Sequence, residues 1–359
     1  MKKYLSLILV IIMAASMAAC GAQQTEPAPV PAQTAAEAAP QTTAEAPADT
    51  AAKLPVVGVL IYKYDDTYIS TVRAAINAAA NGKAEIVMQD GKGDQATQND
   101  QLDVLIEKKV DVLVVNMVDA KAAQGVVDKA KAAGIPVVFF NREPDTAVVK
   151  SYDKAIFVGT NAADAGIMQG EIMKKLWGDG STYDLNKDGV CQYVMFQGEP
   201  DNPEAIARTE YSIKKAEQLG LKCEAVAPVS VCNWDSAQAQ TAMEAMLSSL
   251  EGKIEFVVCN NDGMAQGAVA ALIAAGYNTG EAGAKVIPVI GVDATDAAKD
   301  LIAKGQMSAT VKQDGEAMGN AVVSVALNAA SAKGMLDGTS YKFDDTGVAI
   351  RIPYAPYTK

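Results

Sequence analysis

The feature that most constrains the fold is a regular alternation between short, continuously apolar segments and amphipathic ones. The apolar segments lack the polar alternation of a half-exposed strand, so they predict strands buried on both faces. In the first half of the body these strands are residues 54–61, 84–88, 110–116, 135–140 and 156–158. Between them, apolar residues spaced as on one helix face predict helices at 70–80, 95–107 and 121–132. Strands separated by helices predict a parallel sheet covered on both faces.

The same alternation starts again in the second half of the body. Strands are predicted there at residues 192–196, 223–228, 255–259, 286–292 and 308–311. Helices are predicted at residues 202–219, 236–250, 263–274 and 295–303. A body that runs from residue 53 to residue 359 is too long for one modest core, so we expect two doubly wound α/β units in tandem. Such units bind ligands at the carboxyl ends of their strands, and the cleft between them is the default site.

The first residues of the chain predict export. Lys2 and Lys3 precede an apolar run at residues 5–13 and then a series of small residues, which is the order of a secretory signal. The run is too short to be a comfortable membrane span. We therefore expect residues 1–19 to be a signal peptide.

The segment that follows predicts a lipid anchor and a tether. The sequence Ala-Ala-Cys-Gly around Cys20 resembles the lipobox of bacterial lipoproteins, whose Cys is lipidated and becomes the new N-terminus. Met17 stands where that box usually has Leu, and an ordinary signal peptide cleaved nearby is the alternative. Residues 20–53 are dominated by Ala, Pro, Gln, Thr and Glu, which predicts a disordered and extended tether. The anchor would hold the body at the outer face of the cytoplasmic membrane.

Composition removes several classes of function. The chain has no histidine, which excludes Ser-His and Cys-His nucleophilic catalysis and His-ligated zinc or iron. The formal net charge is −12, and it becomes −14 when Lys2 and Lys3 leave with the signal, which argues against nucleic acid and anionic lipid headgroups as partners. Cys191 and Cys223 begin successive predicted strands, so a disulfide and free buried thiols are both open.

Residues 184–192 match the first part of an EF-hand-type calcium loop. Side-chain oxygens stand at alternate positions, on Asp184, Asn186 and Asp188. Gly189 supplies the sharp turn, Val190 would give its backbone carbonyl, and Gln192 would give a side-chain oxygen. The last position of the loop should be a bidentate Glu but is Met195, so that carboxylate has to come from elsewhere in the fold. A solvated Asp/Asn turn is the alternative.

Polar side chains follow nearly every predicted strand. In the first half they are Tyr64, Asp65, Asp66, Tyr68 and Asn141. In the second half they are Asn202, Glu204, Arg208, Trp234, Asp235, Asn260, Asn261, Asp262, Asp293, Gln313 and Asp314. Hydrogen-bonding groups flanked by one aromatic per unit, Tyr68 and Trp234, suit a neutral polyhydroxylated ring. Each of these residues alone also has a purely structural interpretation. Asp66 and Asp293 could each cap a helix, and Trp234 could belong to the hydrophobic core.

The chain resembles the periplasmic galactose/glucose-binding proteins of bacterial ABC transport over residues 56–354. The resemblance is carried by the stretches IYKYDD, QNDQLDVL, IPVVFFNREP, SYDKA, DLNKDG, GEP, NWDSAQA, NND, GVDA and RIPY. It implies an α/β fold of the type I periplasmic-binding-protein kind, with two Rossmann-like lobes and three hinge crossovers near residues 159–160, 313–315 and 348–351. The N-terminal lobe would comprise residues 54–160 plus 315–348. The C-terminal lobe would comprise residues 161–314 plus 349–359.

The resemblance also implies the residues of two sites. A structural Ca²⁺ would be held by Asp184, Asn186, Asp188, Val190, Gln192 and, as the missing carboxylate, Glu255. The sugar would be bound by Asp66, Tyr68, Asn141, Asn202, Glu204, Arg208, Trp234, Asn261, Asp293 and Gln313. Among these, Tyr68 and Trp234 would sandwich the sugar ring.

Four of these positions depart from the family. Tyr68 stands where the family usually has Phe, Asn202 replaces a His, Glu204 replaces an Asp, and Gln313 replaces an Asn. The last two side chains are a methylene longer, and a buried hydroxyl left unpaired costs about 1–3 kcal/mol. The preferred sugar or anomer could therefore differ from galactose and glucose.

We therefore expect a monomeric substrate-binding lipoprotein of an ABC sugar importer. It would close on galactose, glucose or a related monosaccharide and then dock on the permease subunits in the membrane. The alternatives are a sugar sensor that presents its bound state to a chemoreceptor or sensor kinase, and the same transport role with a different monosaccharide. An enzyme is not expected, although Asp66 and Asp293 could pose as the carboxylate pair of a glycosidase. A transcriptional repressor of this fold would need a DNA-binding headpiece and no export signal.

Overall fold

The computed structural model describes residues 53–178 and 181–359. The predicted signal peptide, Cys20 and the tether as far as residue 52 lie outside the described residues. Among the helices in these two ranges, none is long and apolar enough to cross a membrane. The body contains two β-sheets, one of six strands and one of seven.

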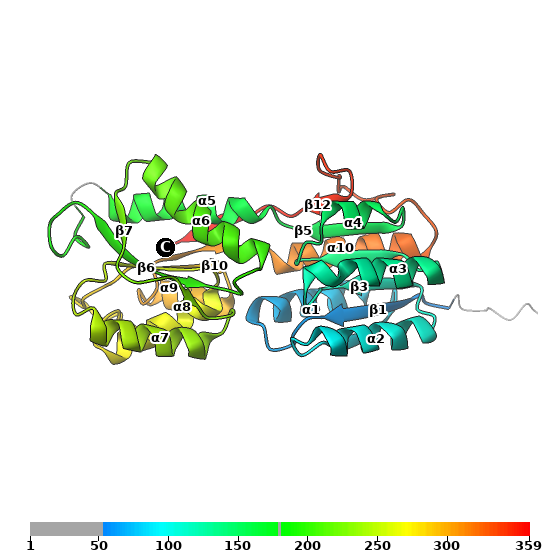
Figure 1. The fold of residues 1–359 in the computed structure, drawn as a ribbon, viewed down its shortest axis with the longest axis horizontal. Helices are drawn as coiled ribbons and strands as arrows, with labels where there is room; N and C mark the ends of the chain where they lie inside the picture. The colour runs from blue at the N-terminus through cyan, green and yellow to red at the C-terminus, as the bar shows by residue number, and fades with distance from the viewer. Residues whose placement is uncertain (1–52, 179–180) are drawn as a thin grey trace, which may run out of the picture. The chain divides into compact units, whose positions relative to one another are not determined.

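The first sheet has the strand order β12-β5-β4-β3-β1-β2, and all of its neighbouring strands run parallel. Its strands are β1 (Val56–Ile61), β2 (Glu85–Asp90), β3 (Val112–Val115), β4 (Val137–Phe140), β5 (Ala155–Gly159) and β12 (Ala349–Arg351). Its helices are α1 (Thr67–Ala80), α2 (Gln95–Glu107), η1 (Ala120–Ala122), α3 (Ala123–Ala133), α4 (Thr146–Lys150) and α10 (Gly315–Ala330). Although α10 comes late in the chain, it packs with α1 and with β3 to β5, as its orange ribbon among blue and green elements shows in Figure 1.

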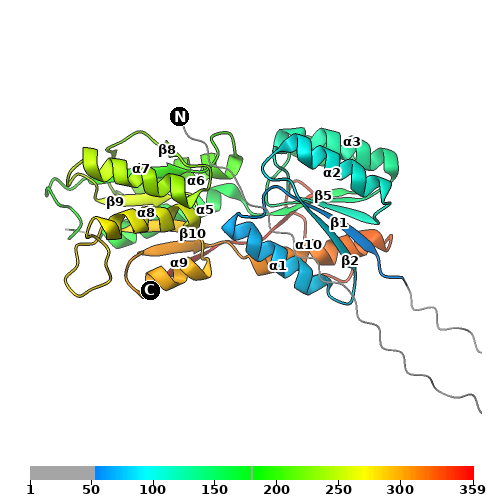
Figure 2. The ribbon, with the colours of Figure 1, turned by 90° about the horizontal axis from the view of Figure 1, so that it is seen from below.

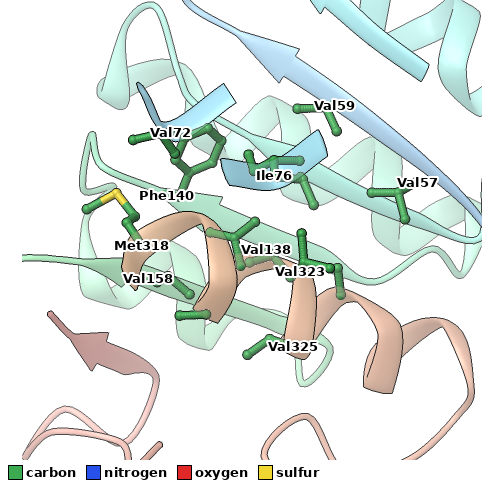
Figure 3. Packing of buried hydrophobic residues seen from close by; sticks show 14 of the residues in the cluster. Val57, Val59, Val72, Ile76, Val138, Phe140, Val158, Met318, Val323 and Val325 are labelled. Carbon is green, nitrogen blue, oxygen red and sulfur yellow. The ribbon is translucent and has the colours of Figure 1, made fainter. Parts of the chain in front are cut away.

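Both faces of the first sheet are buried, because successive residues of a strand point to opposite faces. In β4, Val138 and Phe140 belong to a hydrophobic cluster that α1 and α10 cover. Val137 and Phe139 belong to a second cluster, which α2 and α3 cover. Figure 3 shows the first cluster, in which side chains of α1 and α10 meet those of β1, β4 and β5.

The second sheet has the strand order β13-β11-β10-β9-β6-β7, with β8 paired to β6. Its strands are β6 (Cys191–Gln197), β7 (Cys223–Ala225), β8 (Ser230–Val231), β9 (Phe256–Cys259), β10 (Val289–Asp293), β11 (Ala309–Lys312) and β13 (Ala355–Thr358). All of these pairs run parallel except β11 with β13. Its helices are α5 (Ala162–Trp177), α6 (Pro203–Gln218), α7 (Ser236–Ser249), α8 (Asp262–Ala274) and α9 (Asp296–Ala303).

Helices cover the two faces of the second sheet as well. Ile172 and Met173 of α5 and Ala216 of α6 belong to one cluster, while Met243 of α7 and Ile302 of α9 belong to the other. Figure 2 shows α7 and α8 together on one side of this sheet, where they pack against each other. The body is therefore two layered α/β lobes, which confirms the predicted fold class.

The predicted strands and helices are present with boundaries shifted by a few residues, but six elements were not predicted. They are α4, α5, α10, β8, β12 and β13. The interior of α5 contains Gly166 and Gly170, which weaken a helix pattern. A Cβ on Gly170 would lie 2.4 Å from the carbonyl oxygen of Ser212, so these glycines allow α5 to pack closely on α6. In α10, apolar residues are buried around most of the helix, and its polar face is a narrow stripe of Glu316, Asn320, Ser324 and Asn328.

The chain passes between the two sheets three times. The first crossover follows Gly159 of β5, and the second lies at residues 313–314 between β11 and α10. These two agree with the prediction. The third lies at residues 352–354, because β12 (Ala349–Arg351) pairs with β5 in the first sheet. The predicted assignment of residues 349–351 to the C-terminal lobe is therefore corrected, and β13 alone carries the end of the chain into the second sheet.

Candidate functional site

A pocket of about 390 Å³ is lined by residues that follow strands of both sheets. Its lining includes every residue predicted to bind sugar: Asp66, Tyr68, Asn141, Asn202, Glu204, Arg208, Trp234, Asn261, Asp293 and Gln313. Sequence reasoning did not predict Tyr62, Ile69 and Arg142, which also line the pocket. The carboxyl ends of parallel strands bring these side chains together.

Three of the pocket residues are helix N-caps. Asp66 caps α1 by accepting from the Ile69 amide at 2.7 Å, and its second oxygen accepts from the Tyr62 hydroxyl at 2.5 Å. Asn202 caps α6 and Asn261 caps α8. The cap interpretation of Asp66 is therefore right, whereas Thr295 rather than Asp293 caps α9. Because capping fixes each side chain at the first turn, it also fixes the pocket wall.

Three other pocket residues have backbones in the left-handed region. Their φ angles are +61° for Asn141, +65° for Trp234 and +129° for Asp293. Non-glycine residues with such angles carry strain of about 1–3 kcal/mol each and persist only where the surroundings impose them. In all three cases the unusual backbone directs a side chain to the pocket wall.

The Trp234 ring lies directly against the backbone of Gly198. A Cβ at this glycine would lie 2.3 Å from the ring, so only glycine fits there. Gly198 is the first residue of the GEP stretch, which directly follows β6. The ring is thus packed as a plate at the pocket, while its indole Nε1 is buried without a hydrogen-bond partner. In the opposite lobe Tyr68 is buried, and its hydroxyl lies 3.4 Å from the Met318 sulfur.

Arg208 is the central cation of the pocket and is buried. Its Nη1 donates to the carbonyl oxygen of Asn260 at 2.8 Å, and its Nη2 donates to Gln313 Oε1 at 2.9 Å. Burial lowers the pKa of Arg208, but the neighbouring Tyr354, Glu204 and Asp293 outweigh burial and raise this pKa above its ordinary value. The guanidinium therefore stays charged, and its Nε has no partner.

Glu204 lines the pocket, but both of its oxygens already have partners. Oε1 accepts from the Thr160 hydroxyl at 2.8 Å. Oε2 accepts from Arg208 Nη2 at 3.0 Å and from the Tyr354 hydroxyl at 3.0 Å. Sequence reasoning did not predict a role for Thr160 or Tyr354. The RIPY stretch contained Tyr354, but nothing in the sequence indicated that its hydroxyl reaches this carboxylate.

Four polar atoms of pocket residues are buried without a hydrogen-bond partner in the described part of the chain. They are Arg208 Nε, Trp234 Nε1, Asp293 Oδ2 and Gln313 Nε2. A buried donor or acceptor that stays unpaired costs about 1–3 kcal/mol, so such atoms are rare in folded proteins and indicate a missing partner. Three donors and one carboxyl oxygen match a ligand that both accepts and donates hydrogen bonds, as hydroxyl groups do.

Two buried carboxyl groups lie beside one another at the ends of β9 and β10. Burial is the main cause that raises the pKa of Asp293 well above its ordinary value, and nearby Asp262 raises it further. Burial also raises the pKa of Asp262 to about 7. Asp262 accepts from the Thr310 hydroxyl at 2.6 Å and from the Thr295 amide at 2.8 Å. It thereby ties β9 to the turn that carries Asp293.

The residues of the predicted calcium loop also come together. Glu255 accepts from the Leu185 amide at 2.5 Å and from the Gln192 amide at 3.1 Å, so it reaches the loop from the neighbouring strand segment. The Gln192 amide group donates to Asp188 at 2.9 Å, and its Oε1 is buried without a partner. Within the described residues no three His, Cys, Asp or Glu side chains gather as a metal group by themselves. Amide and carbonyl oxygens would have to complete the coordination, as in other calcium loops.

The described cysteines are free thiols. Cys191 of β6 and Cys223 of β7 stand opposite each other in the parallel register. Burial raises the pKa of Cys223 to about 12 and that of Cys191 further, so neither is a reactive thiolate at neutral pH.

Comparison with known proteins gives three consistent matches. Residues 57–334 match the family of the periplasmic binding protein domain. The chain is 40% identical over 306 residues to the D-galactose/methyl-galactoside binding periplasmic protein of Haemophilus influenzae, a match that covers 84% of this chain and 89% of that protein. An ABC transporter solute-binding protein of Bacillus halodurans, solved with bound myo-inositol, is 30% identical with a TM-score of 0.70 and covers 85% of this chain and 94% of that one.

Proposed function

The chain belongs to the periplasmic binding protein family, and we propose that it is the exported substrate-binding component of an ABC importer for galactose, glucose or a closely related monosaccharide. It binds its substrate without converting it. The relative from Haemophilus influenzae is a D-galactose/methyl-galactoside binding protein, which supports a hexose as the ligand. The protein would work as a monomer and deliver its sugar to permease subunits in the membrane.

The observation that carries this proposal is the set of unpaired polar atoms in the pocket. A sugar hydroxyl can donate to Asp293 Oδ2, and other hydroxyl oxygens can accept from Arg208 Nε and Gln313 Nε2. Because these atoms are already buried, a ligand that pairs them removes an existing desolvation cost. An apolar ligand would leave them unpaired, and a phosphorylated one would meet the buried carboxyl of Asp293.

The two aromatic rings supply the remaining recognition. Tyr68 belongs to the first lobe and Trp234 to the second, and both line the pocket. The C–H faces of a pyranose ring pack on aromatic faces, so closure of the lobes on a sugar brings the two plates together. Transport then needs no chemistry in the pocket, only a closed form that the permease distinguishes from the open one.

Asp293→Asn tests the assignment of the pocket. In asparagine an NH₂ group replaces one carboxyl oxygen and cannot accept a hydrogen bond. Affinity for D-galactose and D-glucose should therefore fall about tenfold to a hundredfold in calorimetric titration, which matches about 1.4–2.8 kcal/mol. Asp296→Asn is the control, because that side chain is fully exposed on α9. Equal affinity of Asp293→Asn and wild type would refute the site.

We further propose that the loop at residues 184–192 binds a structural Ca²⁺. Asp184, Asn186, Asp188, the Val190 carbonyl, Gln192 and Glu255 would hold it. The unpaired Oε1 of buried Gln192 supports this, since a hard cation would give that oxygen a partner. Ca²⁺ would brace the loop to Glu255, the residue that directly precedes β9.

Chelation should lower the melting temperature by several degrees if Ca²⁺ is bound, because ligand binding to the native state stabilises it. Glu255→Gln should lower the melting temperature in the presence of Ca²⁺, and chelator should then have little additional effect. A melting temperature that responds to neither Ca²⁺ nor chelator would exclude the ion.

We also propose that Cys20 is lipidated and anchors the exported protein to the outer face of the cytoplasmic membrane. The Ala-Ala-Cys-Gly sequence supports this. Wild-type protein should partition with membranes and incorporate a labelled fatty acid, whereas Cys20→Ser should do neither. Incorporation that survives Cys20→Ser would show that the anchor is elsewhere.

A further inference from the structure

The three crossovers each place one buried side chain on the pair formed by Arg208 and Glu204. Thr160 belongs to the first crossover, Gln313 to the second and Tyr354 to the third, and all three side chains are buried. Besides its contact with Glu204, the Tyr354 hydroxyl lies 2.9 Å from Arg208 Nη2 and 3.0 Å from the Thr160 hydroxyl. Connections that are distant in sequence therefore meet at one pair of charges.

This network contains more acceptors than protons. Arg208 Nη2 carries two protons and has three acceptors in reach, on Glu204, Gln313 and Tyr354. Tyr354 has a single proton, which faces both Glu204 and Thr160. The acceptors therefore compete for these protons. A change in the orientation of Arg208 would change which crossover residue is hydrogen-bonded to it.

Arg208 joins this network to the pocket. Its Nε is unpaired and the residue lines the pocket, whereas Nη2 points to the crossovers. Because a guanidinium is planar and rigid, a ligand that fixes Nε also fixes the direction of Nη2. Glu204 reaches Thr160 and Tyr354 with a side chain one methylene longer than Asp.

We propose that Thr160 and Tyr354 are positioning residues, which fasten the hinge to the Arg208–Glu204 pair so that an occupied pocket holds the crossovers in one arrangement. Neither residue lines the pocket, so both act through that pair. The inference rests on the proposed function, because it takes a sugar as the pocket's ligand. It assigns Glu204 chiefly to the hinge rather than to direct sugar contact.

Tyr354→Phe tests the proposal, because it removes only the hydroxyl. Tyr152→Phe is the matched control: Tyr152 is also buried, but its hydroxyl has no partner. The Ile352 amide, which donates to the Gly159 carbonyl at 2.7 Å between two crossovers, is the reporter in hydrogen exchange of the ligand-free protein. We expect faster exchange at the amide of Ile352 in Tyr354→Phe and no change in Tyr152→Phe.

Sugar kinetics give a second readout. For a galactose-bound protein we expect dissociation to be about tenfold faster in Tyr354→Phe, with association within about twofold of wild type, because the lost hydrogen bonds hold the closed form. Thr160→Val should act in the same direction and less than multiplicatively with Tyr354→Phe. It also provides the test if Tyr354→Phe does not fold.

Two outcomes separate this inference from the proposed function. If Tyr354→Phe and Thr160→Val match Tyr152→Phe in both exchange and sugar dissociation, the hinge assignment is wrong although sugar binding stands. If wild-type protein binds no sugar, the proposed function fails, and the exchange comparison in ligand-free protein still decides the role of Tyr354.

Discussion

At the residue scale, burial of two carboxyl groups beside the pocket creates a pH dependence of stability. Burial raises the pKa of Asp262 from 3.8 to about 7 and also raises that of Asp293. Between pH values of about 4 and about 7, these carboxyl groups keep their protons in the folded protein and release them in the unfolded chain. Stability from these groups is therefore greatest at low pH and falls as pH rises from about 4 to about 7.

Asp262→Asn tests this pH dependence in the ligand-free protein. The neutral amide does not titrate, so the melting temperature of the variant relative to wild type should rise between pH 5 and pH 7, measured by scanning calorimetry. Asp345→Asn, at an exposed position, should keep a constant difference. A difference for Asp262→Asn that does not change with pH would show that Asp262 is not protonated in this range.

The sequence predicted which residues line the pocket but not how each is used. The ten predicted residues meet because polar side chains at the carboxyl ends of parallel strands share one edge. The roles of Thr160 and Tyr354 could not be predicted, because their hydroxyl contacts depend on where the crossovers meet. Likewise, the unpaired Nε of Arg208 becomes visible only when every neighbour is in place.

At the scale of elements, close packing of α5 on α6 depends on glycine. Gly170→Ala should lower the free energy of unfolding by about 1–3 kcal/mol, because its Cβ would lie 2.4 Å from the Ser212 carbonyl oxygen. Gly125→Ala in α3 is the matched control, since a Cβ there meets nothing within 4 Å. That change should be neutral or stabilising, because alanine is the better helix former. Urea unfolding measures both, and equal stabilities would contradict the packing account.

The elements missed from the sequence share a physical cause. Strands were predictable because a run of buried apolar residues is distinctive, whereas α10 has only a narrow polar stripe and α5 contains glycines. The predicted boundary between the two lobes at residue 349 was misplaced by three residues. Ala349–Arg351 form a short strand, and only its pairing with β5 shows that it belongs to the first lobe.

At the scale of the whole molecule, the family resemblance inferred from dispersed stretches is confirmed by the match over residues 57–334. Aromatic side chains of both lobes line the pocket, and the pair of Arg208 and Glu204 links the pocket to the three connections between the sheets. Sugar binding and lobe closure are thus expected to be one event. The side chains that differ from the family, such as Asn202 and Gln313, lie in the same pocket and are expected to tune which sugar fits.

Calorimetric titration of the protein with a panel of hexoses and pentoses tests the central claim most directly. The account predicts saturable binding of galactose, glucose or a closely related hexose at one site per chain, with a weaker response to pentoses, because fewer hydroxyls would reach the unpaired atoms of the pocket. No heat with any hexose, together with clear binding of a pentose, would contradict the galactose/glucose assignment. No heat with any sugar would contradict the proposed function itself.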